Sequence, residues 1–106
     1  MATGRVGASD LAVTTNTSVY TCPSNTFSVV TVSICNRNST SATVRLALAA
    51  AGAPTTAEYL EYDVQLVGNG TLERTGLVMA AGQIIVAYSN VTGVNVVVYG
   101  IETSTA

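Results

Sequence analysis

The strongest constraint on the fold is an alternation of apolar and polar side chains that recurs along the chain. In residues 28–36, Val30, Val32 and Ile34 on one face alternate with Thr31, Ser33 and Cys35 on the other. Residues 41–49 and 59–67 repeat the pattern, with Val44, Leu46 and Leu48 on one face of the first and Leu60, Tyr62, Val64 and Leu66 on one face of the second. A period of two indicates a strand with one buried face, and β-branched residues favour strands.

Turn-forming residues separate the apolar segments. Clusters at residues 36–40, 68–70 and 80–82 are rich in Asn, Gly, Ser and Ala, and Gly68-Asn69-Gly70 is typical of a tight hairpin turn. A further hairpin is predicted around residues 23–26. An Ala-rich stretch at 46–51 is the one helix candidate, but its alternation through Leu48 favours a strand that ends in a loop.

The predicted architecture is a single all-β domain. Strands are expected at residues 18–22, 28–36, 41–49, 59–67, 71–79, 83–89 and 93–102. About seven to eight short strands with frequent turns indicate an antiparallel β-sandwich, Ig-like or jelly-roll in topology, over residues 16–106. Residues 1–15 show no sustained period and are interpreted as an extended N-terminal arm.

The chain carries unusually little charge. Only 9% of its residues are charged, 48% are hydrophobic, and lysine is absent. A surface of hydroxyls and amides does little to keep like molecules apart, and such groups are less costly to bury than ions. The composition therefore favours a subunit that packs against neighbours. The scattered arginines form no basic stripe for nucleic acid, and no apolar run is long enough to span a membrane, so neither partner is expected.

The last predicted strand is apolar on both faces. Val94, Val96 and Val98 occupy one side, and the other side presents Val97, Tyr99 and Ile101. A strand buried on both sides needs cover on both sides. The second face is expected to be covered by another subunit, by the N-terminal arm or by a loop, and Val97, Tyr99 and Ile101 are predicted contact residues.

Few residue combinations could support catalysis or bind metal. Without histidine, and with Cys22 and Cys35 predicted to lie roughly 20 Å apart as free thiols, zinc sites and nucleophile–base pairs are not expected. Glu61 and Asp63 would share a strand face about 7 Å apart, near the spacing of glycosidase carboxylates. That spacing also arises on any solvated strand, so no enzyme is expected.

Two binding alternatives remain. Glu58, Glu61 and Asp63 could hold calcium, but they lack a ligand-spaced loop, so no metal or cofactor is predicted. The five tyrosines could form a platform on which a sugar stacks. Tyr62 is predicted on the core face with Leu60 and Val64, so packing in a core or interface is the favoured role. The set is Tyr20, Tyr59, Tyr62, Tyr88 and Tyr99.

The order of strands and turns carries a family resemblance. The stretches 19–23 (VYTCP), 29–36 (VVTVSICN) and 42–46 (ATVRL), with 58–60, 81–86 and 98–102, resemble small β-sandwich virion proteins of tailed bacteriophages. The similarity covers residues 18–102.

The resemblance implies a function in the virion. It points to a capsid decoration (cement) protein that bridges shell subunits, with a small tail or fibre component as the alternative. Such a component would bind host carbohydrate if the tyrosines and the Glu61/Asp63 face recognise sugars. It further implies a homotrimer made in the host cytoplasm and placed on the capsid surface. Its partners would be itself and the major capsid protein or another virion protein. In that family the N-terminal arm often makes such contacts, which here would involve Arg5 and Val6.

Overall fold

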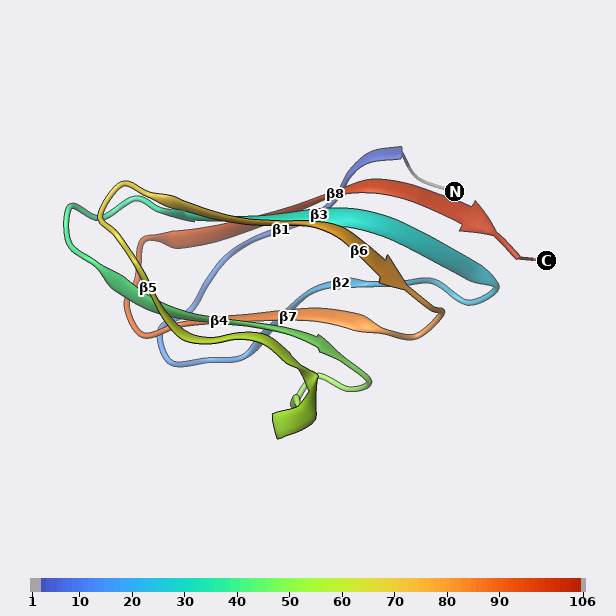
Figure 1. Ribbon diagram of the computed structural model, residues 1–106, viewed down its shortest axis with the longest axis horizontal. Coiled ribbons are helices and arrows are strands. Elements are labelled where there is room, and N and C mark those ends of the chain that lie inside the picture. The colour runs from blue at the N-terminus through green and yellow to red at the C-terminus, as the bar shows by residue number, and fades with distance from the viewer. Residues whose placement is uncertain (1–2, 106) are drawn as a thin grey trace.

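Residues 3–105, which the computed structural model describes, form eight β-strands and one short 3-10 helix. The strands make two antiparallel four-stranded sheets that pack face to face (Figure 1). The prediction of an all-β sandwich is confirmed. The elements are β1 (Thr3–Asp10), β2 (Thr17–Thr21), β3 (Thr26–Asn36), β4 (Ala42–Ala49), η1 (Thr56–Glu58), β5 (Tyr59–Leu66), β6 (Thr71–Met79), β7 (Ile84–Ser89) and β8 (Val94–Ser104).

The strand order is that of a jelly roll. Sheet A has the order β1-β8-β3-β6 and sheet B has the order β2-β7-β4-β5. The first strand pairs with the eighth, the second with the seventh, the third with the sixth and the fourth with the fifth. This is one long hairpin rolled up so that successive pairs alternate between sheets, and the β3–β8 and β4–β7 pairings complete the roll. Of the two topologies expected, the chain adopts the jelly roll.

Two turns predicted as hairpins instead carry the chain from one sheet to the other. Gly70 N–H donates to the carbonyl of Val67 at 3.0 Å, and Asn69 adopts a φ of 56°, so the predicted tight turn forms. The flanking strands β5 and β6 nevertheless lie in different sheets, as do β2 and β3 around residues 23–26. Turn chemistry fixes the reversal of the chain, but it does not fix which strands pair.

The core lies between the sheets and follows the predicted alternation. Along β3, every second residue from Thr26 to Asn36 is buried, and β4 buries Val44 and Leu46 completely. The largest side chains with no exposed surface are Ile34, Leu46, Met79 and Ile85.

The segment expected to be an arm is an edge strand of sheet A. β1 pairs with β8, with Arg5 opposite Tyr99 and Ala8 opposite Val97, and a bulge lies between Arg5 and Gly7. Residues 1 and 2 lie outside the described residues. β1 is joined to β8 by backbone hydrogen bonds and does not bury one apolar face along its length. Its sequence therefore shows no regular spacing of apolar residues. Within residues 3–105, no helix is long and apolar enough to cross a membrane.

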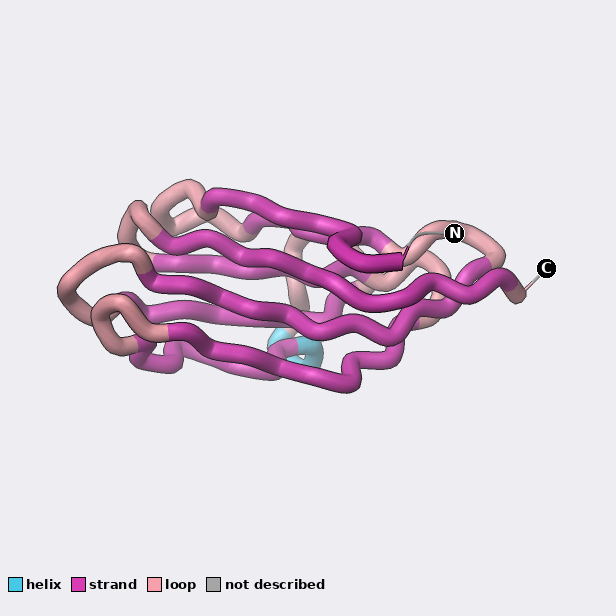
Figure 2. The backbone as a smooth tube through the Cα atoms, turned by 90° about the horizontal axis from the view of Figure 1, so that it is seen from above, coloured by secondary structure: helices cyan, strands magenta, loops and turns pink. Residues whose placement is uncertain are grey.

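The outer faces of the two sheets differ. Among the described residues, no segment crosses the outer face of sheet A, whose strands run along the long axis of the molecule (Figures 1 and 2). The β4–β5 connection, including η1, lies against the outer side of sheet B (Figure 1). One layer is therefore open to a partner, and the other is partly covered by its own loop.

Candidate binding surfaces

The outer face of sheet A carries a continuous apolar row. Val29 on β3 lies opposite Val78 on β6 and opposite Ile101 on β8, so the row crosses three strands. Neighbouring positions on β3 and β8 extend it along the strands. We call this surface the sheet A patch: Phe27, Val29, Val78, Val97, Tyr99 and Ile101. Its exposed fractions include 64% for Val78, 49% for Ile101 and 39% for both Phe27 and Tyr99.

The predicted contact residues occupy different places relative to this patch. Val97, Tyr99 and Ile101 all belong to it, on the outward side of β8. Arg5 is the β1 partner of Tyr99 and lies at the border of the patch. Val6, in contrast, packs against the interior core at the β1 bulge. Val6 is therefore a packing residue in this chain.

Sequence reasoning missed the part of the patch that β3 and β6 supply. Phe27 could have been identified from the sequence. The even-numbered residues of β3 are buried, and Phe27, at an odd position, points to the outer face. The outward position of Val78 was harder to predict. The β3–β6 register shifts between Val30 and Val32, so the alternation along β6 is interrupted.

Tyr99 is fixed in place on this surface. Its hydroxyl donates a hydrogen bond to Oε2 of Glu73 on β6 at 3.1 Å, so the side chain reaches across β3. This hydrogen bond, with some desolvation, raises the pKa of Tyr99. The ring is thus held in one orientation before any partner binds, which lowers the entropic cost of contact.

The outer side of sheet B contains a second, smaller core. Ala47, Ala49 and Val86 are almost completely buried there and pack with Tyr59 and Ile84. The covering loop is held by Glu58, whose carboxylate accepts hydrogen bonds from the backbone N–H groups of Ala50 at 3.0 Å and Thr55 at 2.8 Å. These bonds, that of Thr55 foremost, lower the pKa of Glu58.

Beside this loop, an arginine contacts two tyrosine rings. The guanidinium carbon of Arg45 lies 4.4 Å from the ring centre of Tyr62 and 4.5 Å from that of Tyr88. Arg45 Nε also donates to Oδ1 of Asp63 at 2.6 Å. Tyr59 meets Tyr62 edge to face, with ring centres 4.8 Å apart. A recess of about 380 Å³ is lined by Thr56, Tyr59 and Tyr62.

The prediction that Tyr62 lies on the core face is wrong. Tyr62 is 56% exposed. The register of the β4–β5 pair shifts between Val44 and Leu46, and Asp63 adopts a φ of 53°. Tyr62 and Asp63 together therefore oppose Arg45 in a β-bulge, which turns Tyr62 outward. A second register shift, between Leu46 and Ala47, leaves Leu60 packed against the core, as predicted. Three of the five tyrosines lie on the outer face of sheet B, whereas Tyr20, on β2 of the same sheet, is buried in the core and Tyr99 lies on sheet A.

The same bulge separates the two carboxylates that were considered as a catalytic pair. Glu61 accepts a hydrogen bond from Nη1 of Arg74 on β6 at 2.9 Å, across the open edge of the sandwich. Asp63 pairs instead with Arg45 on the outer face. The predicted same-face arrangement is wrong, and each carboxylate is neutralised by its own arginine. Glu58 is engaged by the loop, and in the described part of the chain no three His, Cys, Asp or Glu residues gather as metal ligands.

The two cysteines are free thiols. Cys22 is buried in the core, where its sulfur accepts a hydrogen bond from Ser28 Oγ at 3.5 Å. Cys35 lies on the outward side of β3. The hairpin from which their separation was predicted does not form, because β2 and β3 belong to different sheets.

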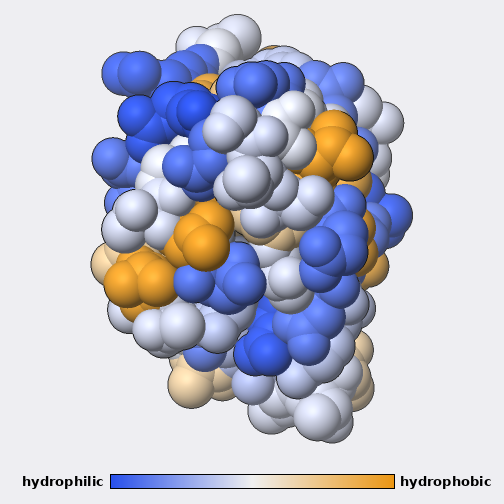
Figure 3. Space-filling view, turned by 90° about the vertical axis from the view of Figure 1, so that its left-hand side faces the viewer, coloured by the Kyte–Doolittle hydropathy of each residue, from blue (hydrophilic) through white to orange (hydrophobic). Residues whose placement is uncertain are grey.

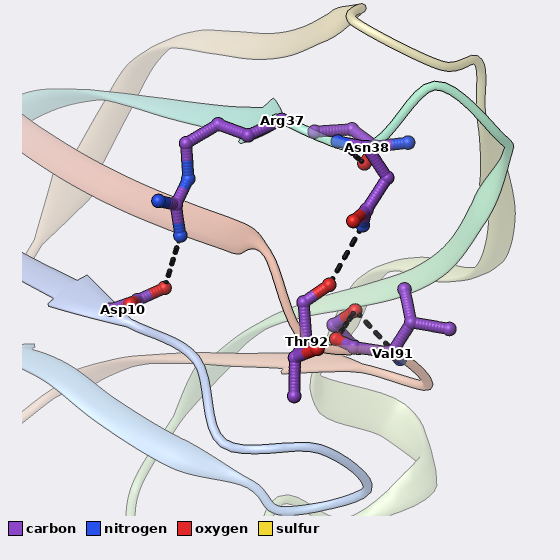
Figure 4. Close-up of polar contacts among 7 residues, drawn as sticks. Asp10, Arg37, Asn38, Val91 and Thr92 are labelled. Atoms are coloured by element: carbon purple, nitrogen blue, oxygen red, sulfur yellow. Dashed lines mark hydrogen bonds and ion pairs between the residues drawn. The ribbon is translucent and has the colours of Figure 1, made fainter.

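The loop end of the sandwich is cross-linked by polar contacts. Arg37 forms an ion pair with Asp10 at 2.6 Å, and Asn38 Nδ2 donates to the carbonyl of Thr92 at 2.7 Å (Figure 4). The surface of this end shows separate apolar patches among polar atoms (Figure 3). Val13 and Val67 are its exposed large apolar side chains. The continuous row on sheet A is therefore the stronger candidate for binding another protein.

No protein-family model matches the chain, and comparisons with curated proteins and with solved structures also give no match.

Proposed function

We propose that this protein is a structural subunit of a virion, a capsid decoration (cement) protein that binds copies of itself and the shell through the sheet A patch. The observation that carries the proposal is the uncovered row of Val78, Val29 and Ile101 across three strands. Contiguous exposed apolar surface of this kind marks sites of protein association. In such a subunit, function depends on buried contact area.

The architecture supports the same proposal. Jelly rolls of eight strands are used by viral capsid domains and by lectins, although a fold alone does not define a function. The strand-and-turn resemblance to small virion proteins of tailed phages favours the first of these uses. The low charge of the chain also suits repeated packing of identical subunits.

The charges near the patch are compatible with a dry interface. Glu73 accepts the hydroxyl of Tyr99, and Arg5 lies at the border, where solvent can reach it. Interfaces typically have an apolar centre and a polar rim. A homotrimer is the proposed assembly, with the major capsid protein or another virion protein as the second partner.

The test compares two equally exposed valines. Val78 and Val67 are each 64% exposed, but only Val78 belongs to the patch. Val78→Asp is expected to shift the wild-type oligomer to monomer in sedimentation velocity, because it buries a charge at the interface. Val67→Asp, at the loop end, should sediment as wild type.

A second experiment addresses the virion itself. Purified protein mixed with undecorated capsids should co-sediment with them, and Ile101→Asp should remain in the supernatant while keeping the wild-type far-UV circular dichroism spectrum. Wild-type protein that stays monomeric at high concentration and does not bind particles would refute the proposal.

A further inference from the structure

We propose that the outer face of sheet B contains a binding site for a neutral glycan, built from the recess lined by Thr56, Tyr59 and Tyr62 together with the Arg45–Asp63 pair. This site is separate from the sheet A patch, because it lies on the opposite layer of the sandwich. It would add ligand recognition to a protein whose proposed role is assembly.

The aromatic part of the site offers a rigid stacking surface. Tyr62 is 56% exposed although its ring contacts both Arg45 and Tyr59. Contact on two sides fixes the ring while a large part of it stays open to solvent. The apolar C–H face of a pyranose packs on such a ring, because both surfaces are flat and the positively polarised C–H groups meet the negative face of the aromatic system.

The polar part of the site suits hydroxyl groups. Arg45 uses Nε and Nη2 on Asp63, which leaves further N–H donors of the guanidinium for a ligand. The side chain of Asp63 is 44% exposed and presents acceptor oxygens beside those donors. Vicinal sugar hydroxyls are donors and acceptors at once, so an adjacent guanidinium and carboxylate match them.

The charges argue against ionic ligands. Arg45 and Asp63 neutralise each other at 2.6 Å, and the carboxylate of Glu58 lies in the adjoining loop, so an anion gains little here. A cation would be repelled by the positive charge of Arg45, whose guanidinium lies beside the Tyr62 and Tyr88 rings, whereas a neutral ligand would not. The recess of about 380 Å³ is near the lower end of the range for small-ligand sites, about 300–1,000 Å³. A short neutral oligosaccharide is the ligand that fits these constraints.

The direct experiment is saturation-transfer difference NMR of the full chain with a panel of neutral oligosaccharides, supported by a glycan array. The wild type is expected to bind at least one member of the panel. Tyr62→Ala should weaken that binding roughly tenfold or more, because the stacking surface is lost. Val67→Ala, which removes a comparably exposed side chain at the loop end, outside both proposed binding surfaces, is the matched control and should bind as wild type.

A second variant separates recognition from folding. Asp63 occupies the left-handed region with a φ of 53°, which asparagine also tolerates. Asp63→Asn should therefore keep the bulge, and the wild-type amide spectrum, while it weakens glycan binding severalfold.

Three results would overturn the proposal: a wild type that binds no glycan, a Tyr62→Ala variant that binds as well as wild type, or binding of proline-rich peptides in place of sugars. The two proposals can fail separately. The Val78→Asp variant should lose assembly and keep glycan binding. The Tyr62→Ala variant should lose glycan binding and keep assembly.

Discussion

Asn36 and Leu66 are joined inside the sandwich by a hydrogen bond from Nδ2 of Asn36 to the carbonyl oxygen of Leu66, at 3.1 Å. Asn36 ends β3 in sheet A, and Leu66 ends β5 in sheet B, so this bond ties the two layers together. The same amide group also donates to the carbonyls of Thr40 and Val67, and Oδ1 accepts from the N–H of Asn38. A completely buried amide thereby holds two loops of the roll in register.

Replacing Asn36 by alanine should destabilise the fold by about 2–4 kcal/mol, because the buried carbonyl of Leu66 would lose its partner, at about 1–3 kcal/mol, and three part-buried hydrogen bonds would be lost with it. Urea denaturation monitored by tyrosine fluorescence measures the change. Asn95→Ala, on the outward side of β8, is the matched control and should change stability by less than about 0.5 kcal/mol. A similarly small effect at Asn36 would show that this network does not hold the sheets together.

Gly100 marks a close approach between β8 and β3. A Cβ atom at this position would overlap the carbonyl oxygen of Val29 and lie 2.8 Å from Cα of Val30. We expect Gly100→Ala to cost about 1–3 kcal/mol or more in thermal or urea unfolding, because the strands must move apart. Gly52→Ala is the control, since its added methyl group would meet only the side chain of Ser18, at 3.3 Å. Equal stability of the two variants would contradict the tight β3–β8 packing.

The features predicted correctly from sequence are those set by neighbouring residues. Strand β3 follows a strict period of two and β4 follows it as far as Leu46, so the core face of each could be assigned. The same parity placed Val97, Tyr99 and Ile101 on the side of β8 opposite to the core. No knowledge of pairing partners was needed for either result.

The features predicted wrongly depend on distant contacts or on a single irregular residue. Tyr62 was assigned to the core because the alternation of apolar and polar residues continues unbroken through Asp63, where the bulge reverses the face of Tyr62. The weak signal was Asp63 itself, a residue type that tolerates positive φ. The assembly of Arg45 with Tyr62 and Tyr88 was hidden for a related reason, because it needs the pairing of β4 with both β5 and β7.

Tyr20 should make stability depend on alkaline pH. Its hydroxyl donates to Oε2 of Glu102 at 2.6 Å, and burial, followed by this hydrogen bond, raises the pKa of Tyr20 well above its ordinary value of 10.0. The folded state therefore retains a proton that the unfolded state releases above about pH 10, so the free energy of unfolding should fall as the pH rises beyond that point. The stabilisation is fully present below that pH.

Urea denaturation over a range of alkaline pH tests this prediction, and the absence of lysine removes one overlapping titration. Tyr20→Phe should flatten the decline, although it lowers stability at neutral pH by removing the hydrogen bond. Tyr88→Phe is the control and should keep the wild-type slope. If the free energy of unfolding of Tyr20→Phe fell with pH as steeply as that of the wild type, the alkaline effect would come from groups other than Tyr20.

Strand β1 provides the clearest test of whether the N-terminal segment is part of the domain. Its ladder with β8 runs from Thr3 opposite Ile101 to Asp10 opposite Asn95, and Val6 packs against the core. Removing residues 1–10 should cost about 3 kcal/mol or more, since each lost backbone hydrogen bond contributes about 0.5–1.5 kcal/mol. The exposed edge of β8 should also promote aggregation. Arg5→Ala keeps the backbone ladder and should unfold like the full chain, whereas an unchanged melting temperature in the truncated protein would show that the segment is a separable arm.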